Sequence, residues 1–535
     1  MTDVAETLEV AVRHHQSGDL TGARRQYQQV LKTDPDNADA LHSLGLIALQ
    51  NGQYDKALDL ISKAIEQNSQ NPQFYNNLGV VFKALRKIEK AIEAYQQALS
   101  LNPDFAEAYN NMGSVLYALG RFSDAVENCR QAISLNPDYP EAYNNLAAAL
   151  QALGQYEAAL ENCRQAVLIK PDYVEAYNTM ASVLQMYGRC DEAIETYRQA
   201  IRLAPDYAKV HNNLGMVLLL NARFIEGWKK YEWRLKSSVT AYPFRSQSCR
   251  WDGSSFVGKT LLVCCEQGLG DSLQFVRYLP MVKAFGGKVI LSAKKALSGL
   301  FRQCPGIDDL VETSGNAPDV NFDFHVPLLS LPGIFATTLE TIPADVPYLY
   351  ADPIKVEYWK DKFAEADFKV GIVWAGSPSN DNDRNRSCAL RHFTTLAKIE
   401  GVKLYSLQKS IAAAQLDELP PNIVIPNFAE QLDDFTDTAA VIENLDLVIS
   451  ADTAVLHLAG AMGKPVWALL PFAPDWRWML DRDDSPWYPT MRLFRQEKWN
   501  DWDGVFAHIA EQLKILTEKR IAEISLTNQT GVICR

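Results

Sequence analysis

A 34-residue period runs through the first half of this 535-residue chain. Prolines mark the period most clearly. They stand at Pro35, Pro103, Pro137, Pro171 and Pro205, with Ser69 in the one missing place. Two other residue types keep the same spacing, namely the alanines Ala23, Ala57, Ala91, Ala125, Ala159 and Ala193 and the glycines Gly18, Gly52, Gly120, Gly154 and Gly188. Seven blocks fit between Val4 and about Ala241, so this half repeats one short structural unit.

The residue types at the repeated positions predict two helices in each block. Alanine lets two helices approach closely, and glycine makes the turn between them. A coiled coil would show a 7-residue period instead. The 34-residue period, with a proline at the block end, is typical of tetratricopeptide repeats. We therefore predict an α-helical tetratricopeptide solenoid over residues 1–241, whose stacked blocks form a superhelix with a concave groove.

A row of amide side chains recurs at the sixth position of the blocks. Its members are Asn77, Asn111, Asn145 and Asn213, with Ser43 and Thr179 in the remaining places. An amide offers a donor and an acceptor that match a peptide backbone, so a row of them would hold an extended polypeptide without reading its side chains. The other interpretation is that these asparagines tie neighbouring helices together.

The seventh block departs from the pattern. Gly227 replaces the alanine, and the sequence FIEGWKKYEWRLK is richer in aromatic residues. A terminal repeat that caps the array or docks on another domain is expected to be atypical. The turn-rich stretch that follows is assigned as a linker, residues 242–258.

The remaining sequence predicts two α/β halves. The stretch that begins KTLLVCCEQGLGDSLQ indicates a strand, a glycine loop and a helix, followed by a second strand, which is a βαβ unit. A second such start is FKVGIVWAGSP, at Phe368–Pro378. We assign residues 259–350 and 351–535 to two Rossmann-like halves with a cleft between them. Ligands of such sheets bind beyond the carboxyl ends of the strands.

The stretch LDLVISADTAVLHLAGAMGKPVWALL, Leu445–Leu470, predicts a buried strand, a break, a helix and a second buried strand. Asp452 and Thr453 come at the break, at the N-terminus of the expected helix. Backbone N–H groups and the helix dipole favour a phosphate there. His457 follows Thr453 by one turn on the same helix face and adds a donor. The alternative is that Asp452 or Thr453 is merely an N-cap.

Three other loops supply candidate residues at the ends of predicted strands. Asp271 follows a glycine pair, and its carboxylate would accept a proton from an attacking hydroxyl, or else only cap its helix. Gln408 and Lys409 follow the strand VKLYSL, and Lys409 is suited to a diphosphate that develops negative charge. The loop after GIVWAG carries the last candidates, Ser377, Arg384 and Arg386, in which arginine suits a diphosphate. For Lys409 and the arginines the alternative is an ordinary solvated side chain.

Composition excludes several classes of protein. The formal charge is −13 and the pI about 5.2, which argues against a nucleic-acid-binding protein. The N-terminus lacks the pattern of a signal peptide, and no run of 18 apolar residues exists, so no membrane span is expected. The nine cysteines are scattered, which predicts reduced thiols and a cytoplasmic location.

ISADTAVLHLAGAMGKPVWALL is similar to the D-T-G-x-x-H-L-A-A-A motif of bacterial lipopolysaccharide heptosyltransferases, with Ala454 in place of the glycine. QGLGDSLQFVRYLP resembles the G-D-x-x-x-x-x-P element of that family, whose proposed catalytic base aligns with Asp271. The resemblance implies a GT-B fold in which residues 259–350 form the acceptor half and residues 351–535 bind a nucleotide sugar. The whole chain resembles bacterial repeat-containing glycosyltransferases, and its architecture is that of the O-GlcNAc transferases, whose inner asparagines bind substrate protein.

These resemblances lead us to predict a glycosyltransferase that moves a sugar from a nucleotide-diphosphate sugar to a hydroxyl of a protein held in the repeat groove. One alternative keeps the chemistry but has a glycan or lipid acceptor, with the repeats docking a partner protein. Another is an interaction scaffold with an inactive transferase half. DND at Asp381–Asp383 and DRD at Asp481–Asp483 mimic the D-x-D metal motif of other glycosyltransferases. We predict no metal and no cofactor, because helix ends and cations supply the charge stabilisation in a GT-B enzyme.

Overall fold

A computed structural model of the chain describes residues 4–236, 242–244, 249–313, 317–363, 368–380 and 382–531, with side chains as far as residue 520. The chain divides into two compact units, residues 1–205 and 206–535. The seventh helical pair therefore belongs to the second unit, and the division differs from the boundary predicted after residue 241. The predicted linker, residues 242–258, lies partly outside the described residues.

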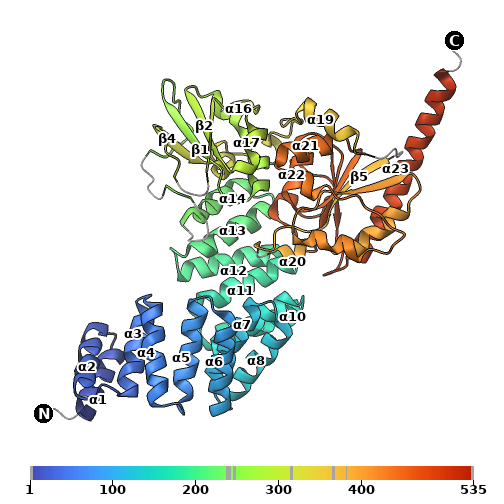
Figure 1. The fold of residues 1–535 in the computed structure, drawn as a ribbon. Helices are drawn as coiled ribbons and strands as arrows, with labels where there is room; N and C mark the ends of the chain where they lie inside the picture. The colour runs from blue at the N-terminus through green and yellow to red at the C-terminus, as the bar shows by residue number, and fades with distance from the viewer. Residues whose placement is uncertain are drawn as a thin grey trace. The chain divides into compact units, whose positions relative to one another are not determined.

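The first unit is a stack of helical pairs, one pair to each 34-residue block (Figure 1). The helices are α1 (Val4–Gln16), α2 (Leu20–Thr33), α3 (Ala38–Gln50), α4 (Tyr54–Gln67), α5 (Pro72–Ala84), α6 (Ile88–Leu101), α7 (Ala106–Ala118), α8 (Phe122–Leu135), α9 (Pro140–Ala152), α10 (Tyr156–Ile169), α11 (Val174–Met186) and α12 (Cys190–Leu203). The repeated alanines, from Ala23 to Ala193, are fully buried where the helices cross. The predicted repeat solenoid is confirmed.

The turn within each block shows that the repeat geometry does not depend on glycine alone. The repeated glycines, from Gly18 to Gly188, all adopt a positive φ, between 71° and 82°. In the two blocks that lack the glycine, Arg86 and Ala222 occupy its place and still adopt φ values of 57° and 58°. Because helix packing on both sides determines this turn, a residue with a Cβ is held in the left-handed conformation there.

The asparagine row links one repeat to the next. The Nδ2 atom of Asn111 donates to Oδ1 of Asn76 (3.0 Å), and Nδ2 of Asn145 donates to Oδ1 of Asn110 (2.8 Å). The Nδ2 atom of Asn77 lies 2.8 Å from Nε2 of His42. Each of these bonds joins residues 35 positions apart. In three of the four predicted acceptor-binding asparagines, the amide nitrogen thus bonds to the neighbouring repeat. This is the interpretation in which the asparagines tie neighbouring helices together. Asn213 lies on α13, in the other unit.

Between Asn77 and Asn213 the row is interrupted at Thr179, and this interruption leaves an unpaired acceptor. Thr179 on α11 stands where an asparagine would reach back 35 positions to Asn144 on α9. Among the described residues, none is a hydrogen-bond partner for the buried Oδ1 of Asn144. The threonine side chain is too short and has no amide nitrogen, so the inter-repeat bond is missing at this one step.

Replacing Thr179 by asparagine is therefore expected to stabilise the repeat unit. The new amide would donate to Oδ1 of Asn144 and add about 0.5–1.5 kcal/mol to the free energy of unfolding. Urea unfolding of residues 1–205, followed by helical circular dichroism, measures the gain. Thr179→Val is the matched control, because it has the same shape and no donor. An asparagine variant no more stable than the valine variant would show that Asn144 is not the acceptor.

The seventh helical pair, α13 (Ala208–Leu220) and α14 (Phe224–Tyr231), packs within the second unit. The indole Nε1 of Trp228 donates to the backbone oxygen of Thr337 (2.9 Å), and its ring meets that of Trp476 edge-on at 5.3 Å. Just after α14, the buried Arg234 donates from Nη2 to Oε1 of Glu266 (2.7 Å) and to Oγ of Ser330 (2.9 Å). The aromatic residues that made this block atypical therefore form an interface with the α/β region, as the docking prediction expected.

The first α/β half is a parallel sheet in the order β3-β2-β1-β4. Its strands are β1 (Thr260–Cys264), β2 (Lys288–Ala293), β3 (Asp309–Glu312) and β4 (Phe324–Pro327). Its helices are α15 (Leu269–Phe275), α16 (Leu279–Lys283), α17 (Lys295–Phe301) and α18 (Leu331–Ile334). The predicted βαβ start is confirmed, since β1, α15 and β2 follow one another and β1 pairs in parallel with β2.

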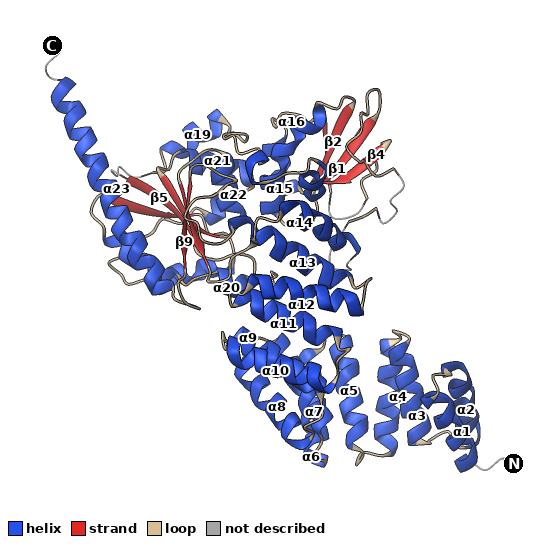
Figure 2. Ribbon diagram, turned by 180° about the vertical axis from the view of Figure 1, so that it is seen from behind, coloured by secondary structure: helices blue, strands red, loops and turns tan. Residues whose placement is uncertain are grey.

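The second α/β half is a parallel sheet in the order β6-β5-β7-β8-β9, with helices on its faces (Figure 2). The strands are β5 (Phe368–Val373), β6 (Val402–Ser406), β7 (Leu447–Ala451), β8 (Val466–Leu470) and β9 (Met491–Arg495). The helices are α19 (Pro353–Lys360), α20 (Asp383–Arg386), α21 (Phe435–Glu443), α22 (Ala454–Ala461) and α23 (Trp502–Gly531). Apolar side chains of α23 complete the core under the sheet. No described helix has the length and apolarity that crossing a membrane requires.

Candidate functional site

The strand orders indicate where a ligand would bind, namely between the two α/β halves. In each sheet the strand order reverses beside the first strand, between β1 and β4 in one half and between β5 and β7 in the other. Ligands bind beyond the carboxyl ends of strands at such switch points. The loops that follow β1, β5, β6 and β7 line one cleft of about 770 Å³. The sequence-predicted residues of these four loops are thus brought to one place, with the exceptions given below.

The N-terminus of α22 opens into this cleft. The helix begins at Ala454, and Thr453 is its N-cap residue. Among the described residues, the side chain of Thr453 forms no capping hydrogen bond, and its Oγ1 lies 3.2 Å from Oγ of Ser450 instead. The first N–H groups of the helix are therefore left for another acceptor. Thr453, Ala454 and Val455 line the cleft, so an anion in the cleft is within reach of these groups.

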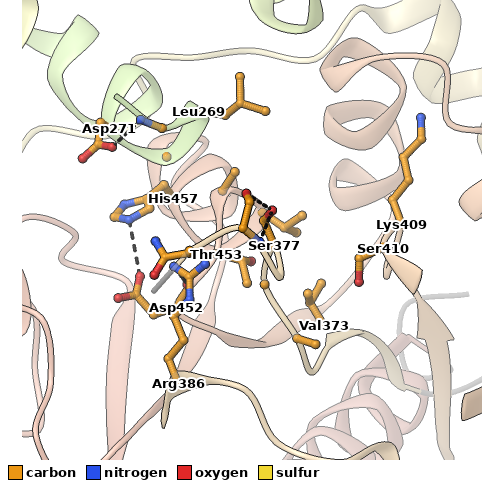
Figure 3. Close-up of a pocket in the computed structure, with 18 of the residues that line it drawn as sticks. Leu269, Asp271, Val373, Ser377, Arg386, Lys409, Ser410, Asp452, Thr453 and His457 are labelled. Atoms are coloured by element: carbon orange, nitrogen blue, oxygen red, sulfur yellow. Dashed lines mark hydrogen bonds and ion pairs between the residues drawn. The ribbon is translucent and has the colours of Figure 1, made fainter. Parts of the chain in front are cut away.

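Asp452 and His457 contact each other (Figure 3). Each of them also bonds to an aromatic residue. Oδ1 of Asp452 lies 3.6 Å from Nε2 of His457, and its Oδ2 accepts from Nε1 of Trp478 (3.0 Å). Nδ1 of His457 lies 2.9 Å from the hydroxyl of Tyr488. Burial opposes ionisation of Asp452, but its contacts with His457 and Trp478 outweigh burial and lower the pKa of the carboxyl group. Both ring nitrogens of His457 thus face protein groups, and the residue also lines the cleft. Its role as a hydrogen-bond donor to a phosphate stays a prediction.

The close approach of α15 and α22 depends on a glycine. A Cβ atom on Gly270 would lie 2.8 Å from Cδ2 of His457 and 3.6 Å from the Cα atom of Ala454. The first of these distances is shorter than side chains tolerate. Gly270 therefore lets the helix that carries Asp271 come against the helix that carries His457, which sets the width of the cleft.

Asp271 lies in the first turn of α15 and has two partners. Its Oδ2 accepts from the backbone N–H of Gly268 (2.8 Å), so it does cap its helix. Its Oδ1 pairs with Nη2 of Arg477, which comes from the other half. The Asp271 side chain remains 18% exposed and lines the cleft, so it is accessible from the cleft.

Gln408 and Lys409 line the cleft at the end of β6, but protein groups occupy their polar atoms. Oε1 of Gln408 accepts from the N–H groups of Trp374 (3.1 Å) and Ala375 (2.9 Å), and its Nε2 donates to the backbone oxygen of Ala375 (2.9 Å). Gln408 is 2% exposed and joins the loop after β5 to the loop after β6, so it has a structural role there, and its predicted donor-binding role stays a prediction. The Nζ atom of Lys409 donates to the backbone oxygens of Leu432 and Asp433.

The loop after β5 contributes two of its three predicted residues to the cleft. Ser377 lines the cleft, and its Oγ lies 2.8 Å from Oγ of Ser379. Arg386 also lines it, with Nη1 donating to the backbone oxygen of Asp452 (2.9 Å) and Nε 3.3 Å from Oδ1 of Asp383. Arg384 lies on the same short helix, α20, and is not among the residues that line the cleft.

Sequence reasoning missed two basic residues of the cleft. Lys294, which follows β2, donates from Nζ to the backbone oxygen of Gln267 (2.6 Å). Arg477 lies in the stretch DWRWML, for which the sequence predicts no site residue. Its place in a cluster of tryptophans could have indicated it, because an arginine buried among aromatic residues needs a carboxylate partner. Among the described residues, no group of three or more His, Cys, Asp and Glu side chains is arranged to hold a metal ion, and Asp381 lies outside them.

Two family models match the chain. Residues 2–216 match the Cilia and flagella-associated protein 70 C-terminal domain, and residues 397–489 match Glycosyltransferase family 9 (heptosyltransferase). The second match contains the strand–helix–strand unit β7-α22-β8 and the Arg477 segment. It therefore covers the half of the cleft that holds the open helix N-terminus.

Two curated proteins are similar to parts of the chain. Protein FlbA of Caulobacter vibrioides is 29% identical over 313 residues, which is 54% of this chain and 52% of FlbA. Photosystem I assembly protein Ycf3 of Prochlorococcus marinus is 37% identical over 59 residues, which is 10% of this chain and 34% of Ycf3. The matches thus span about half of the first relative and a third of the second.

Among solved structures, MamA is 27% identical with a TM-score of 0.28, covering 32% of this chain and 92% of that one. The pilF protein of Pseudomonas aeruginosa is 20% identical with a TM-score of 0.34, covering 38% and 92%. The repeat period, the two parallel sheets and the family matches lead to one conclusion. The chain joins a tetratricopeptide-repeat array to an α/β region in which residues 397–489 match the glycosyltransferase family 9 model.

Proposed function

We propose that this chain is a glycosyltransferase that moves a sugar from a nucleoside-diphosphate sugar to a hydroxyl group of a protein docked on its repeats. The observation that carries the proposal is the cleft between two parallel sheets, with the open N-terminus of α22 on one wall and Asp271 on the other. The family 9 match over the donor side of the cleft supports the reaction class.

The diphosphate is placed against the start of α22. The free N–H groups there and the positive end of the helix dipole stabilise negative charge. Arg386 and Lys409, which also line the cleft, add positive charge around the leaving group. As the bond between the sugar and the diphosphate breaks, negative charge develops on the leaving oxygen, and these fixed groups stabilise it in the transition state.

Asp271 is placed to take the proton of the acceptor. The hydroxyl oxygen attacks the anomeric carbon, the bond to the diphosphate breaks, and the hydroxyl proton passes to the Asp271 carboxylate. A base in hydrogen-bond reach of the attacking hydroxyl accelerates this step. Since Asp271 comes from the first half and the open helix from the second, the reaction needs both halves of the cleft.

The chemical class of the acceptor does not follow from the cleft. It depends on the repeats, whose asparagine side chains bond from one repeat to the next. The engaged amides of Asn77, Asn111 and Asn145 favour the repeats as a docking surface over a clamp on peptide backbone. This keeps a second candidate, in which the acceptor is a glycan or lipid and the repeats recruit a partner protein. Incubation with labelled donor and a cell extract distinguishes them, since label enters either protein or the glycan and lipid fraction.

Nucleoside diphosphates are expected to raise the melting temperature of the protein, because a ligand that binds only the folded state stabilises it. Ala454→Asp is expected to abolish most of this shift. The new carboxylate at the first position of α22 suits the helix dipole and preserves the fold, but it repels the diphosphate. Binding weaker by about tenfold, or about 1.4 kcal/mol, is expected in calorimetry.

Ala454→Asn is the matched control, since it has the same shape without the charge. Equal affinity in the aspartate and asparagine variants would place the diphosphate elsewhere. No shift with any of the common nucleoside diphosphates would count against a nucleotide-sugar donor altogether.

A further inference from the structure

We infer that Arg477 is a positioning residue that holds Asp271 in its working orientation for sugar transfer, an inference that rests on the function proposed above. Arg477 belongs to the second half of the α/β region, and Asp271 belongs to the first. The two residues are separated by 206 positions in the sequence. Their contact therefore connects the acceptor side of the cleft to the donor side.

All three nitrogens of the Arg477 guanidinium donate to protein groups. Nε donates to Oε1 of Gln274 (2.6 Å), Nη1 donates to Oδ1 of Asp475 (2.8 Å), and Nη2 pairs with Oδ1 of Asp271. Burial opposes its charge, but Asp475 and Asp271 outweigh burial and raise the pKa of the guanidinium, so Arg477 stays charged. Each of its three nitrogens thus donates to a protein group, as expected of a residue that supports its neighbours.

The contact fixes the helix as well as the carboxylate. Gln274 and Asp271 both lie on α15, so Arg477 holds this helix at two points one turn apart. Each oxygen of Asp271 then has one fixed donor, Gly268 N–H on Oδ2 and Arg477 on Oδ1. A carboxylate oxygen accepts more than one hydrogen bond. The Asp271 carboxylate therefore can still receive the acceptor proton, while its two fixed donors prevent it from rotating.

Arg477 is itself held in place by its surroundings. Its guanidinium lies over the ring of Trp476, 4.4 Å from the centroid, and Trp476 packs against Trp228 of the seventh helical pair. Two residues later, Met479 adopts φ 53° and ψ −169°, a conformation that costs energy outside glycine. The backbone oxygen of Trp478, next to Met479, accepts from Nη2 of Arg495 (2.5 Å). These contacts keep the segment in one conformation.

The same segment holds a carboxylate from each half. Arg477 binds Asp271 of the first half, and the adjacent Trp478 donates from Nε1 to Oδ2 of Asp452 of the second (3.0 Å). Consecutive residues of one short turn thus locate Asp271 and Asp452, one acidic group from each half, relative to each other. This is the geometry expected when a base on one half must meet a sugar held by the other, because a misplacement of 1 Å costs roughly 10²-fold in rate.

The test measures steady-state transfer by wild type, R477Q, R477K, D271N and the double variant D271N/R477Q. We expect kcat to fall by roughly 10²-fold in R477Q, with the donor KM essentially unchanged. R477K, which retains one charge but not the three-way contact, is expected to recover part of the loss. Because Arg477 acts through Asp271, the double variant is expected to be no slower than D271N alone. R492Q, an exposed arginine of the same half, is the control.

Three results would overturn the inference. They are unchanged kcat in R477Q, a raised donor KM with unchanged kcat, and a double variant slower than D271N by the full single-variant factor. If R477Q shows no cooperative melting transition, the same criteria are applied to R477K. A wild-type protein without transfer activity would overturn the proposed function and this inference with it, whereas an active wild type with unaffected Arg477 variants overturns the inference alone.

Discussion

Asp271→Asn is expected to lower kcat for sugar transfer by roughly 10²–10⁴-fold, the usual contribution of a general base. The amide cannot accept the proton of the attacking hydroxyl, although its oxygen can still accept from the N–H of Gly268. Donor binding is expected to be nearly unchanged, because the open helix N-terminus lies on the other half. Steady-state kinetics with saturating donor, together with calorimetric donor affinity, checks both parts.

Helix capping by Asp271 makes a stability control necessary. The melting temperature of the variant shows how much of any loss in rate comes from a weakened α15. Asp309→Asn, an exposed carboxylate paired with Lys288 in the same half, is the matched control and is expected to retain full activity. A D271N enzyme with near wild-type kcat would mean that another group takes the proton and that Asp271 serves only as a cap.

Arg234→Met is expected to destabilise the second unit by about 3–5 kcal/mol, since it leaves a buried carboxylate without its partner. The side chains of Arg234 and Glu266 are only 2% and 1% exposed, and their Nη2 and Oε1 atoms lie 2.7 Å apart. Oε2 of Glu266 already lacks a hydrogen-bond partner among the described residues. The free energy of unfolding, measured by denaturant titration with tryptophan fluorescence, gives the loss.

Two further variants serve as controls for this result. Arg302→Met removes an exposed arginine of the same half and is expected to leave the unfolding midpoint unchanged. Arg234→Met combined with Glu266→Leu is expected to recover most of the loss, because an apolar pair of similar size replaces a buried ion pair at little cost. A single variant as stable as wild type would show that the pair does not tie the seventh helical pair to the first sheet.

The repeat array and the sheets could be predicted because their signals are local. The 34-residue period needs only spacing, and the stretch Leu445–Leu470 indicated in advance the order strand, break, helix, strand that β7, α22 and β8 show. The start of the second half at Phe368 was likewise predicted from an apolar run. In each case neighbouring residues determine the structure, so a single sequence contains the information.

The supports of the cleft could not be predicted, because they depend on contacts between distant segments. Nothing near Arg477 indicates that its partner is Asp271. The occupied polar atoms of Gln408 and His457 likewise follow from loops that only the fold brings together. The asparagine row was recognised by its period, yet a period alone could not decide between binding a ligand and binding the next repeat.

The place where the chain divides has a consequence for how such proteins change over evolutionary time. The seventh helical pair is anchored to the α/β region by Trp228 and by Arg234 just after it, so it belongs structurally with the cleft. Blocks of a repeat array contact only their immediate neighbours. Whole blocks before residue 206 can therefore be gained, lost or exchanged without disturbing the cleft. Under the proposed function, selection for a new partner protein would act on the repeat blocks, and selection for a new sugar would act on the cleft. These are separate stretches of one gene, and the seventh helical pair would be kept constant with the cleft.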